Sequence, residues 1–357
     1  MRNEPATVPL RELRAAVPTR CFAPSTARSL AHLAFDVALL ATLYALAWRA
    51  PAWTAPLYWL AQGTMLWALF VLGHDCGHGA FSRRRWLNGL VGHLTHTPLL
   101  VPYHAWRISH RIHHRHVGDV ERDETWVPLT ATQIASLPWY VRLLRFRLPL
   151  VAFPFYLVRR SPGRVGSHFA PRGALFRDGE RARVALSVAA CAAFGALLVA
   201  FAVVAGPGAL VRWYVGPWLV FVVWIDLVTL LHHTAPGVPW YRGAAWSFAR
   251  GALSTLDRRY GALEWLHHDA GCHVVHHLFP TIPHYRLREA ARAVRPLLGE
   301  SYREDRRALL VALREAIRDC HAVPESGDVA LYEPRREAKV GARSLASGAG
   351  SRPATTW

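Results

Sequence analysis

The sequence predicts an all-α integral membrane protein, with four transmembrane helices in two hairpins and a cytoplasmic helical cap that holds a histidine-rich di-metal site. Three observations lead to this fold class. Apolar residues make up 52% of the 357 residues and charged residues only 18%, a balance typical of a membrane-embedded chain. Long uncharged stretches alternate with arginine-rich segments, and many of the 20 histidines gather in three short clusters.

Three apolar stretches are long enough to cross a bilayer, because a helix needs about 20 residues to span about 30 Å of hydrocarbon. A further stretch is shorter and contains Asp36, which would lie near the interface end. The spans are expected at about 33–48, 55–73, 184–206 and 213–231. Short turns at 49–54 and 207–212 join them in pairs, which gives two hairpins. The fourth span contains Asp226, and we expect this carboxylate to have a specific partner, because an acid inside a span costs about 3 kcal/mol.

The positions of the basic residues predict the orientation. All but two of the 42 Lys and Arg lie in the N-terminal segment, between the hairpins or after the fourth span, and only Arg49 and Arg212 lie in the short turns. Positive residues near the ends of spans remain in the cytoplasm, so both termini and the metal site are expected there. The net charge of +18 is then membrane-surface basicity, and nucleic-acid binding is not expected.

The remaining segments complete the expected organisation. Residues 1–30 are a cytoplasmic N-terminal tail, and residues 31–323 are the membrane domain, with a cap built from 74–183 and 234–323. Gly, Ser, Pro and Ala dominate residues 324–357, which predicts a disordered C-terminal tail. The five Cys show no regular spacing and no C-x-x-C, so a disulfide scaffold is excluded.

Histidines spaced three and four residues apart form three clusters, HDCGH, HRIHH and HVVHH. This spacing places imidazoles on one face of a helix, and two crossings between the second and third clusters return all three to the same side. Eight imidazoles exceed the four ligands of a structural zinc site, so two metal ions are expected. Imidazole suits zinc, copper, iron and nickel alike. The eight residues are His74, His78, His110, His113, His114, His273, His276 and His277.

These clusters and their surroundings resemble the histidine boxes of the membrane fatty acyl desaturase superfamily. The similarity includes GHDCGHGAFS at 73–82, PYHAWRISHRIHH at 102–114, WIDLVTLLHH at 224–233 and LHHDAGCHVVHHLFPTIPHYRL at 266–287. It extends from about residue 70 to about residue 300 and is greatest to the omega-3 branch of the plant and cyanobacterial acyl-lipid enzymes. One departure is Thr234, where that branch has a third histidine and which resembles the omega-6 (delta-12) branch instead.

The resemblance implies an oxidoreductase that uses two iron ions and O₂ to introduce a cis double bond, near the methyl end, into an acyl-lipid or acyl thioester in the membrane. The eight histidines of the boxes would bind the irons, and His233 matches the family's ninth ligand, with His232 as the second choice. The chain has no flavin or haem fingerprint, so the expected electron donor is ferredoxin or a b-type cytochrome.

Other residues are expected to position the metal ligands. A metal-bound histidine usually donates its second ring nitrogen to a carboxylate or carbonyl group, and acids lie beside all three boxes. Asp226 precedes His233 by seven residues, two helical turns on the same face. The residues predicted to support the ligands are Asp226, His104, His232, Asp75, Asp269 and His268.

Three other functions remain open from the sequence alone. An omega-6 (delta-12) desaturase would share the boxes and would differ in the position of the double bond. A diiron acyl hydroxylase or acetylenase would use the same irons and differ in its product. A histidine-rich zinc transporter would place its ligands at mid-membrane along a path, whereas these clusters lie outside the expected spans.

Overall fold

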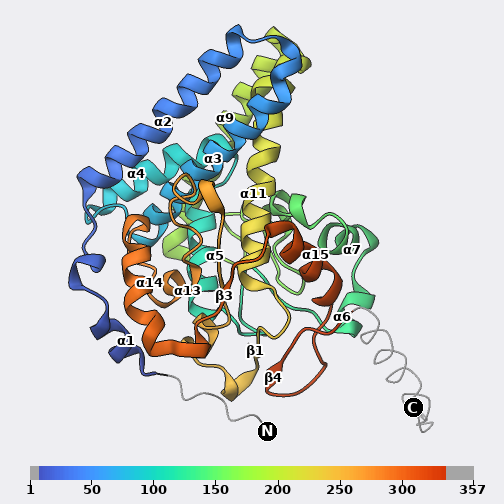
Figure 1. Ribbon diagram of the computed structural model, residues 1–357. Helices are drawn as coiled ribbons and strands as arrows, with labels where there is room; N and C mark the ends of the chain where they lie inside the picture. Colours follow the sequence, from blue (N-terminus) through green and yellow to red (C-terminus); the bar gives the residue numbers. More distant parts are fainter. Residues whose placement is uncertain (1–7, 335–357) are drawn as a thin grey trace, which may run out of the picture.

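The computed structural model describes residues 8–334 and is mainly helical (Figure 1). Four of its helical segments are long and apolar enough to cross a membrane: Thr26–Arg49, Ala52–His78, Asp178–Ala205 and Pro207–His233. The expectation of four such segments is confirmed, and each of the four expected spans lies almost entirely within one of them. Their main helices are α2 (Thr26–Arg49), α3 (Ala55–His78), α9 (Arg181–Ala205) and α11 (Gly216–His233). The fourth segment begins with α10 (Pro207–Leu210) and a π-helical turn (Val211–Val215).

Helices α3 and α11 pack closely against each other. A Cβ added to Gly63 of α3 would lie 2.4 Å from the carbonyl oxygen of Pro217, so a side chain larger than hydrogen would separate the helices. Farther along the pair, the indole Nε1 of Trp224 donates to Thr64 Oγ1 over 3.0 Å. This packing brings the C-terminal ends of the two helices together, and these ends carry histidines.

The other two long helices, α2 and α9, expose apolar side chains. Only 11% of the apolar window of the first segment and 6% of that of the third are buried, and Val203 and Val204 of α9 are 81% and 88% exposed. Helices that are apolar all round are stable only where lipid or protein covers them. The turn residue Arg212 ties the fourth segment to α2, because its Nη2 donates to the carbonyl oxygens of Ala47 and Ala50 over 3.0 and 3.2 Å.

Shorter helices and two small sheets make up the rest of the fold, much of it drawn below the long helices in Figure 1. The helices are α1 (Leu10–Ala16), α4 (Arg85–His96), α5 (Tyr103–His116), α6 (Ala131–Ser136), α7 (Trp139–Phe146), α8 (Phe153–Arg159), α12 (Phe248–Ala252), α13 (His273–Leu278), α14 (His284–Leu298) and α15 (Leu309–Asp319). Strand β1 (Trp240–Tyr241) pairs antiparallel with β4 (Val329–Ala330), and β2 (Asp257–Arg258) pairs parallel with β3 (Glu304–Asp305).

Parts of both expected tails belong to the folded structure. Within residues 1–30, Leu13 of α1 is fully buried in a cluster formed mainly with α13 and α14. The expected disorder from 324 onward does not hold for residues 324–334, because β4 pairs with β1 through backbone hydrogen bonds that composition does not reveal. Residues 335–357 of that tail lie outside the described residues.

The close contact between α3 and α4 should be sensitive to a single methyl group. A Cβ on Gly73 would lie 2.2 Å from Thr95 Oγ1 and 2.3 Å from His96 Nδ1. We expect Gly73→Ala to destabilise the protein by about 1–3 kcal/mol, the usual cost of overpacking, and thermal unfolding in detergent measures this. The matched control is Gly89→Ala on α4, where an added Cβ meets nothing within 4 Å. Equal unfolding midpoints for the two variants would contradict the prediction.

Candidate metal centre

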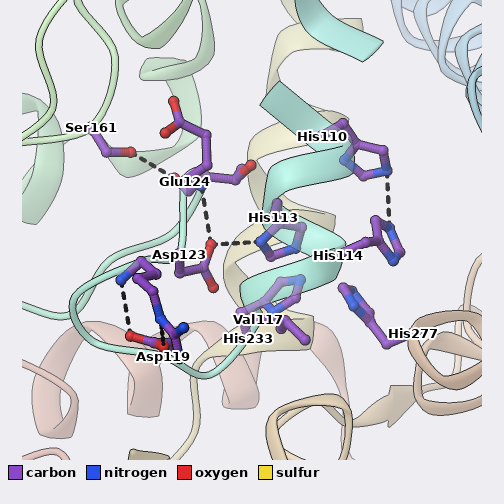
Figure 2. Close-up of polar contacts among 12 residues, drawn as sticks. His110, His113, His114, Val117, Asp119, Asp123, Glu124, Ser161, His233 and His277 are labelled. Carbon is purple, nitrogen blue, oxygen red and sulfur yellow. Dashed lines mark hydrogen bonds and ion pairs between the residues drawn. The ribbon is translucent and has the colours of Figure 1, made fainter. Parts of the chain in front are cut away.

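Nine histidines converge from four helices. Helix α3 ends in the first pair, α5 carries three along its C-terminal half, α11 contributes its last residue and α13 contributes three. Figure 2 shows five of them, with the α5 histidines facing His233 and His277. The structure therefore brings together the whole predicted ligand set: His74, His78, His110, His113, His114, His233, His273, His276 and His277.

Five of these side chains form the first group. Its members, each of which offers one ring nitrogen within 4.8 Å of the others, are His74, His78, His110, His114 and His276. The Nε2 atom of His110 lies 3.0 Å from that of His78 and 3.1 Å from that of His114. Two nitrogens this close can share one N–H at most, whereas a cation bound among the five could accept the lone pairs of all of them.

The second group lies directly beside the first. It contains His113, His233 and His277, whose ligand atoms also lie within 4.8 Å of one another. His273 joins them, because its Nε2 lies 3.0 Å from the Nε2 atoms of both His233 and His277. The rings of His114 and His277 stack with their centroids 4.1 Å apart, so the two groups are in direct contact. Five and four imidazoles together suit two adjacent metal ions.

The environment keeps these imidazoles able to bind metal. Burial lowers the pKa of five of the histidines on α5 and α13 well below its ordinary value, and the neighbouring imidazoles lower it further. They are His110, His114, His273, His276 and His277. At neutral pH these rings are uncharged, which is the form that coordinates a metal. A donor set made only of imidazole nitrogen fits a transition metal and not calcium or magnesium.

A buried carboxylate fixes one of the ligands. Asp123 Oδ1 lies 2.7 Å from His113 Nδ1, and both side chains are almost completely buried (Figure 2). The same oxygen accepts the backbone N–H of Thr125 over 3.1 Å, and Arg164 Nη2 donates to the backbone oxygen of Asp123 over 2.7 Å. These contacts hold the His113 ring so that its ε-nitrogen is available to the other members of the second group. A carboxylate behind the ring commonly orients a metal-binding histidine in this way. Asp123 is one of several acids near the boxes, and nothing in the sequence distinguishes it as the partner of a metal-binding histidine.

Two of the residues predicted to support the ligands lie beside the centre. Asp75 Oδ1 is 3.8 Å from His74 Nδ1. The His232 ring packs at a tilt against that of His273, with ring centroids 4.3 Å apart. Both ring nitrogens of His232 are occupied, by the carbonyl oxygen of Leu256 at 2.6 Å and by the hydroxyl of Tyr260 at 2.8 Å. His232 can therefore support the second group but offers it no free nitrogen.

Two predicted acids do not contact a histidine of the centre. Asp226 instead accepts the backbone N–H of Phe153 over 3.0 Å. Helical spacing correctly places it on the face of His233, but the two-turn separation leaves the carboxylate too far along α11 to reach that ring. Asp269 forms an ion pair with Arg288 at 2.5 Å, because the turn before α13 directs it toward α14.

Two predicted histidines also point elsewhere. His104 packs against His93, with ring centroids 4.9 Å apart, since a separation of six residues from His110 places the two rings on different faces of α5. His268 Nε2 lies 2.7 Å from Asp36 Oδ2 on α2. We expected both residues to orient box histidines, and the structure corrects this expectation. Their actual partners depend on how the helices pack, which the sequence does not reveal.

A largely apolar cavity of about 400 Å³ lies against the histidines. Aromatic side chains form much of its wall: Trp67, Phe70, Trp106, Phe153 and Tyr156. Thr229 and Asp226 of α11 line it as well. Members of both histidine groups also line it, among them His74, His110, His113 and His233. A long, flexible hydrocarbon is the kind of ligand that such a wall accommodates.

Removing the carboxylate charge beside His113 should loosen the second group. We expect Asp123→Asn to lower metal affinity or activity about 10- to 100-fold, the usual effect of an outer partner of a metal ligand. Elemental analysis of the purified protein, together with the product yield, measures both quantities. The control is Asp178→Asn, which removes an exposed carboxylate paired with the half-exposed Arg181 and should leave both unchanged. Full metal content and activity in Asp123→Asn would contradict the prediction.

Comparison with known proteins agrees with this arrangement. Residues 25–307 match the family model described as "Fatty acid desaturase". The chain is 50% identical to the sn-1 acyl-lipid omega-3 desaturase (ferredoxin) of Synechocystis sp., over 93% of each chain. It is 48% identical to the sn-2 acyl-lipid omega-3 desaturase (ferredoxin), chloroplastic, of Helianthus annuus, over 92% of this chain and 77% of that one. It is 45% identical to the acyl-lipid omega-3 desaturase (cytochrome b5), endoplasmic reticulum, of Arabidopsis thaliana, over 93% of this chain and 90% of that one.

Proposed function

The chain belongs to the fatty acid desaturase family, and from this premise we propose that it is an omega-3 desaturase of membrane acyl-lipids. The resemblance of the histidine boxes to this superfamily is confirmed, and so is an oxygen-dependent desaturase as the enzyme class. The relatives named above are omega-3 desaturases, which favours the methyl-end position over the omega-6 position that Thr234 left open.

The observation that carries the proposal is the contact between the apolar cavity and both histidine groups. An acyl chain lying in this cavity would present its methylenes to whatever the histidines hold. The aromatic wall would fix the chain's position and exclude water from the reacting carbons. Distance along the cavity would then select the carbon pair that loses hydrogen.

The nine converging histidines are proposed to hold two irons, with O₂ as the co-substrate. His74, His78, His110, His114 and His276 would hold one ion, and His113, His233, His273 and His277 the other. Bound there, the ions would supply the oxidising power for unactivated C–H bonds, which no side-chain acid or base can supply. The chain's own part is to keep the imidazoles neutral, to fix His113 through Asp123 and to hold the acyl chain.

Arginines line the same cavity and are suited to a lipid headgroup. Arg160 is already paired with Glu124 at 2.5 Å, whereas Arg159 on α8 is exposed. Its guanidinium contacts the hydroxyl of Tyr140 and remains open to solvent. Guanidinium groups bind phosphate oxygens in bidentate geometry. We propose that Arg159 contacts the phosphate or carbonyl oxygens of an acyl-lipid whose tail occupies the cavity.

The arrangement in the membrane is also proposed. The four long helices would form two hairpins within a membrane domain over residues 31–323, with both termini and the histidine centre on the cytoplasmic side. The distribution of Lys and Arg supports this orientation, since only Arg49 and Arg212 lie in the turns opposite the histidines.

The electron donor is proposed to be ferredoxin or a b-type cytochrome, and the arginine-rich surface is suited to an acidic carrier. Relatives named with each donor have similar identities to this chain, 50% for the Synechocystis protein and 45% for the Arabidopsis protein. Supplying reduced ferredoxin or reduced cytochrome b5 to purified protein in lipid vesicles would decide between them.

Expression in a host whose lipids contain linoleate tests the proposed reaction. Fatty acid methyl esters from the cells should contain a new methyl-end double bond that is absent with empty vector. Mass spectrometry distinguishes the alternatives: a hydroxylated product would favour an acyl hydroxylase, a triple bond an acetylenase, and linoleate made from oleate an omega-6 desaturase. Any of these outcomes in place of the omega-3 product would refute the proposed reaction.

A further inference from the structure

A third histidine cluster lies outside the nine-histidine centre. His32 of α2, His268 of the loop before α13 and His284 at the start of α14 each offer a ring nitrogen within 4.8 Å of the others. A helix near the N-terminus thus meets two segments from the C-terminal third of the sequence. His268 and His284 are 4% and 2% exposed, and His32 is half-buried.

Each of the two buried rings has one nitrogen held by a buried carboxylate. His268 Nε2 lies 2.7 Å from Asp36 Oδ2, and His284 Nδ1 lies 2.9 Å from Asp75 Oδ2. A carboxylate that accepts one ring N–H leaves the opposite nitrogen as a lone-pair donor, which is the usual arrangement behind a metal-bound histidine.

The opposite nitrogens are the ones that lack a partner. His268 Nδ1 and His284 Nε2 are buried and make no hydrogen bond, and an unsatisfied buried polar atom costs about 1–3 kcal/mol. The His32 ring lies edge-on to His284, with centroids 4.7 Å apart, and stacks on Tyr285 at an interplanar angle of 3°. Each of the three side chains thus offers a ring nitrogen within 4.8 Å of the others, and two of the rings have a buried nitrogen without a hydrogen bond.

The backbone at His268 is consistent with a constrained ligand. His268 and Asp269 have φ angles of 52° and 53°, a left-handed conformation that costs about 1–3 kcal/mol for such residues and persists only where the surroundings hold it. The ion pair of Asp269 with Arg288 at 2.5 Å and the contact of His268 with Asp36 hold this turn in place.

We propose that His32, His268 and His284 bind a third metal ion, a zinc-type dication, distinct from the two-metal centre. Three imidazoles with a fourth position open to water or to another ligand are a common zinc environment. The ion would link α2 to α14 and to the turn before α13. Asp75 would connect the two sites, because its other oxygen lies 3.8 Å from His74 Nδ1.

The test uses the full-length, iron-loaded protein purified in detergent and equilibrated with Zn²⁺ alone. Elemental analysis should find about one zinc per chain in addition to the iron, with X-ray absorption showing nitrogen ligands near about 2.0 Å. His32→Gln should lose this zinc and keep its iron. Asp36→Asn, which leaves all three imidazoles in place, should weaken zinc binding about 10- to 100-fold.

The matched control is His93→Gln, which changes a half-buried histidine on α4 that contacts Tyr103 and His104. It should bind zinc as the unchanged protein does. Zinc that enters the iron positions would lower iron equally in all variants, and this separates it from the third site. The proposal is overturned if the unchanged protein takes up no zinc, or if His32→Gln takes up as much. Neither outcome depends on whether the enzyme makes an omega-3 double bond.

Discussion

Replacement of His276 by alanine is expected to abolish desaturation and to deplete the protein of iron. His276 belongs to the first group, with its Nε2 3.2 Å from that of His114 and its ring centroid 4.7 Å from that of His74. Loss of an outer partner of a metal ligand already costs about 10- to 100-fold, so removal of the ligand itself should cost at least about 100-fold. Methyl ester profiles of cells expressing each protein measure the activity.

The control for this variant is His116→Ala. His116 is the last residue of α5 and packs against Trp246, with ring centroids 5.7 Å apart, and it belongs to neither histidine group. Thermal unfolding in detergent should show both variants folded, so that lost activity reflects the metal centre and not the fold. A normal product profile with full iron content in His276→Ala would contradict the assignment of His276 as a ligand.

The ligand set could be predicted because two simple features of the sequence determine it. Separations of three and four residues place imidazoles on one helical face, and an even number of expected spans between the second and third clusters predicts that all three lie on the same side. Both signals are local, and the structure brings all eight residues together. His233 required the family resemblance as well, because a histidine pair at the end of an apolar helix can equally well lie at an interface.

The partners of the ligands could not be predicted, because they depend on how helices pack. Asp75 and Asp123 both lie near boxes in the sequence, yet Asp123 lies 2.7 Å from His113 Nδ1 whereas Asp75 lies 3.8 Å from His74 Nδ1. The loop after α5 folds back onto that helix, and no spacing rule describes such a loop. Asp226 shows the opposite case, since its helical face was correct and its partner was a backbone N–H.

Asp36 is a second acid within an expected span, at 33–48. A carboxylate within an expected span should have a specific partner, as was argued for Asp226. Asp36 is 1% exposed and contacts His268, more than 200 residues away in the sequence. The sequence does not identify this partner, but the free-energy cost of burying an acid within a span does indicate a polar site on α2.

Filling the cavity should separate substrate binding from metal binding. Thr229 lines the cavity and precedes His233 by four residues, so the two side chains share a face of α11. We expect Thr229→Trp to occupy the space next to the second histidine group and displace the acyl chain. Desaturation should fall at least about 100-fold, as expected when reacting atoms are misplaced by about 1 Å, while the iron content stays at the level of the unchanged protein.

The matched control introduces the same side chain at an exposed position outside the cavity. Leu197 of α9 is 66% exposed and does not line the cavity, so Leu197→Trp should keep both iron and activity. Product yield and elemental analysis on the same preparations distinguish the possible outcomes. If Thr229→Trp remained active, the acyl chain would have to reach the irons by another route. If Thr229→Trp lost iron as well, the loss of activity could come from the metal centre alone, and the cavity could not be assigned to the substrate.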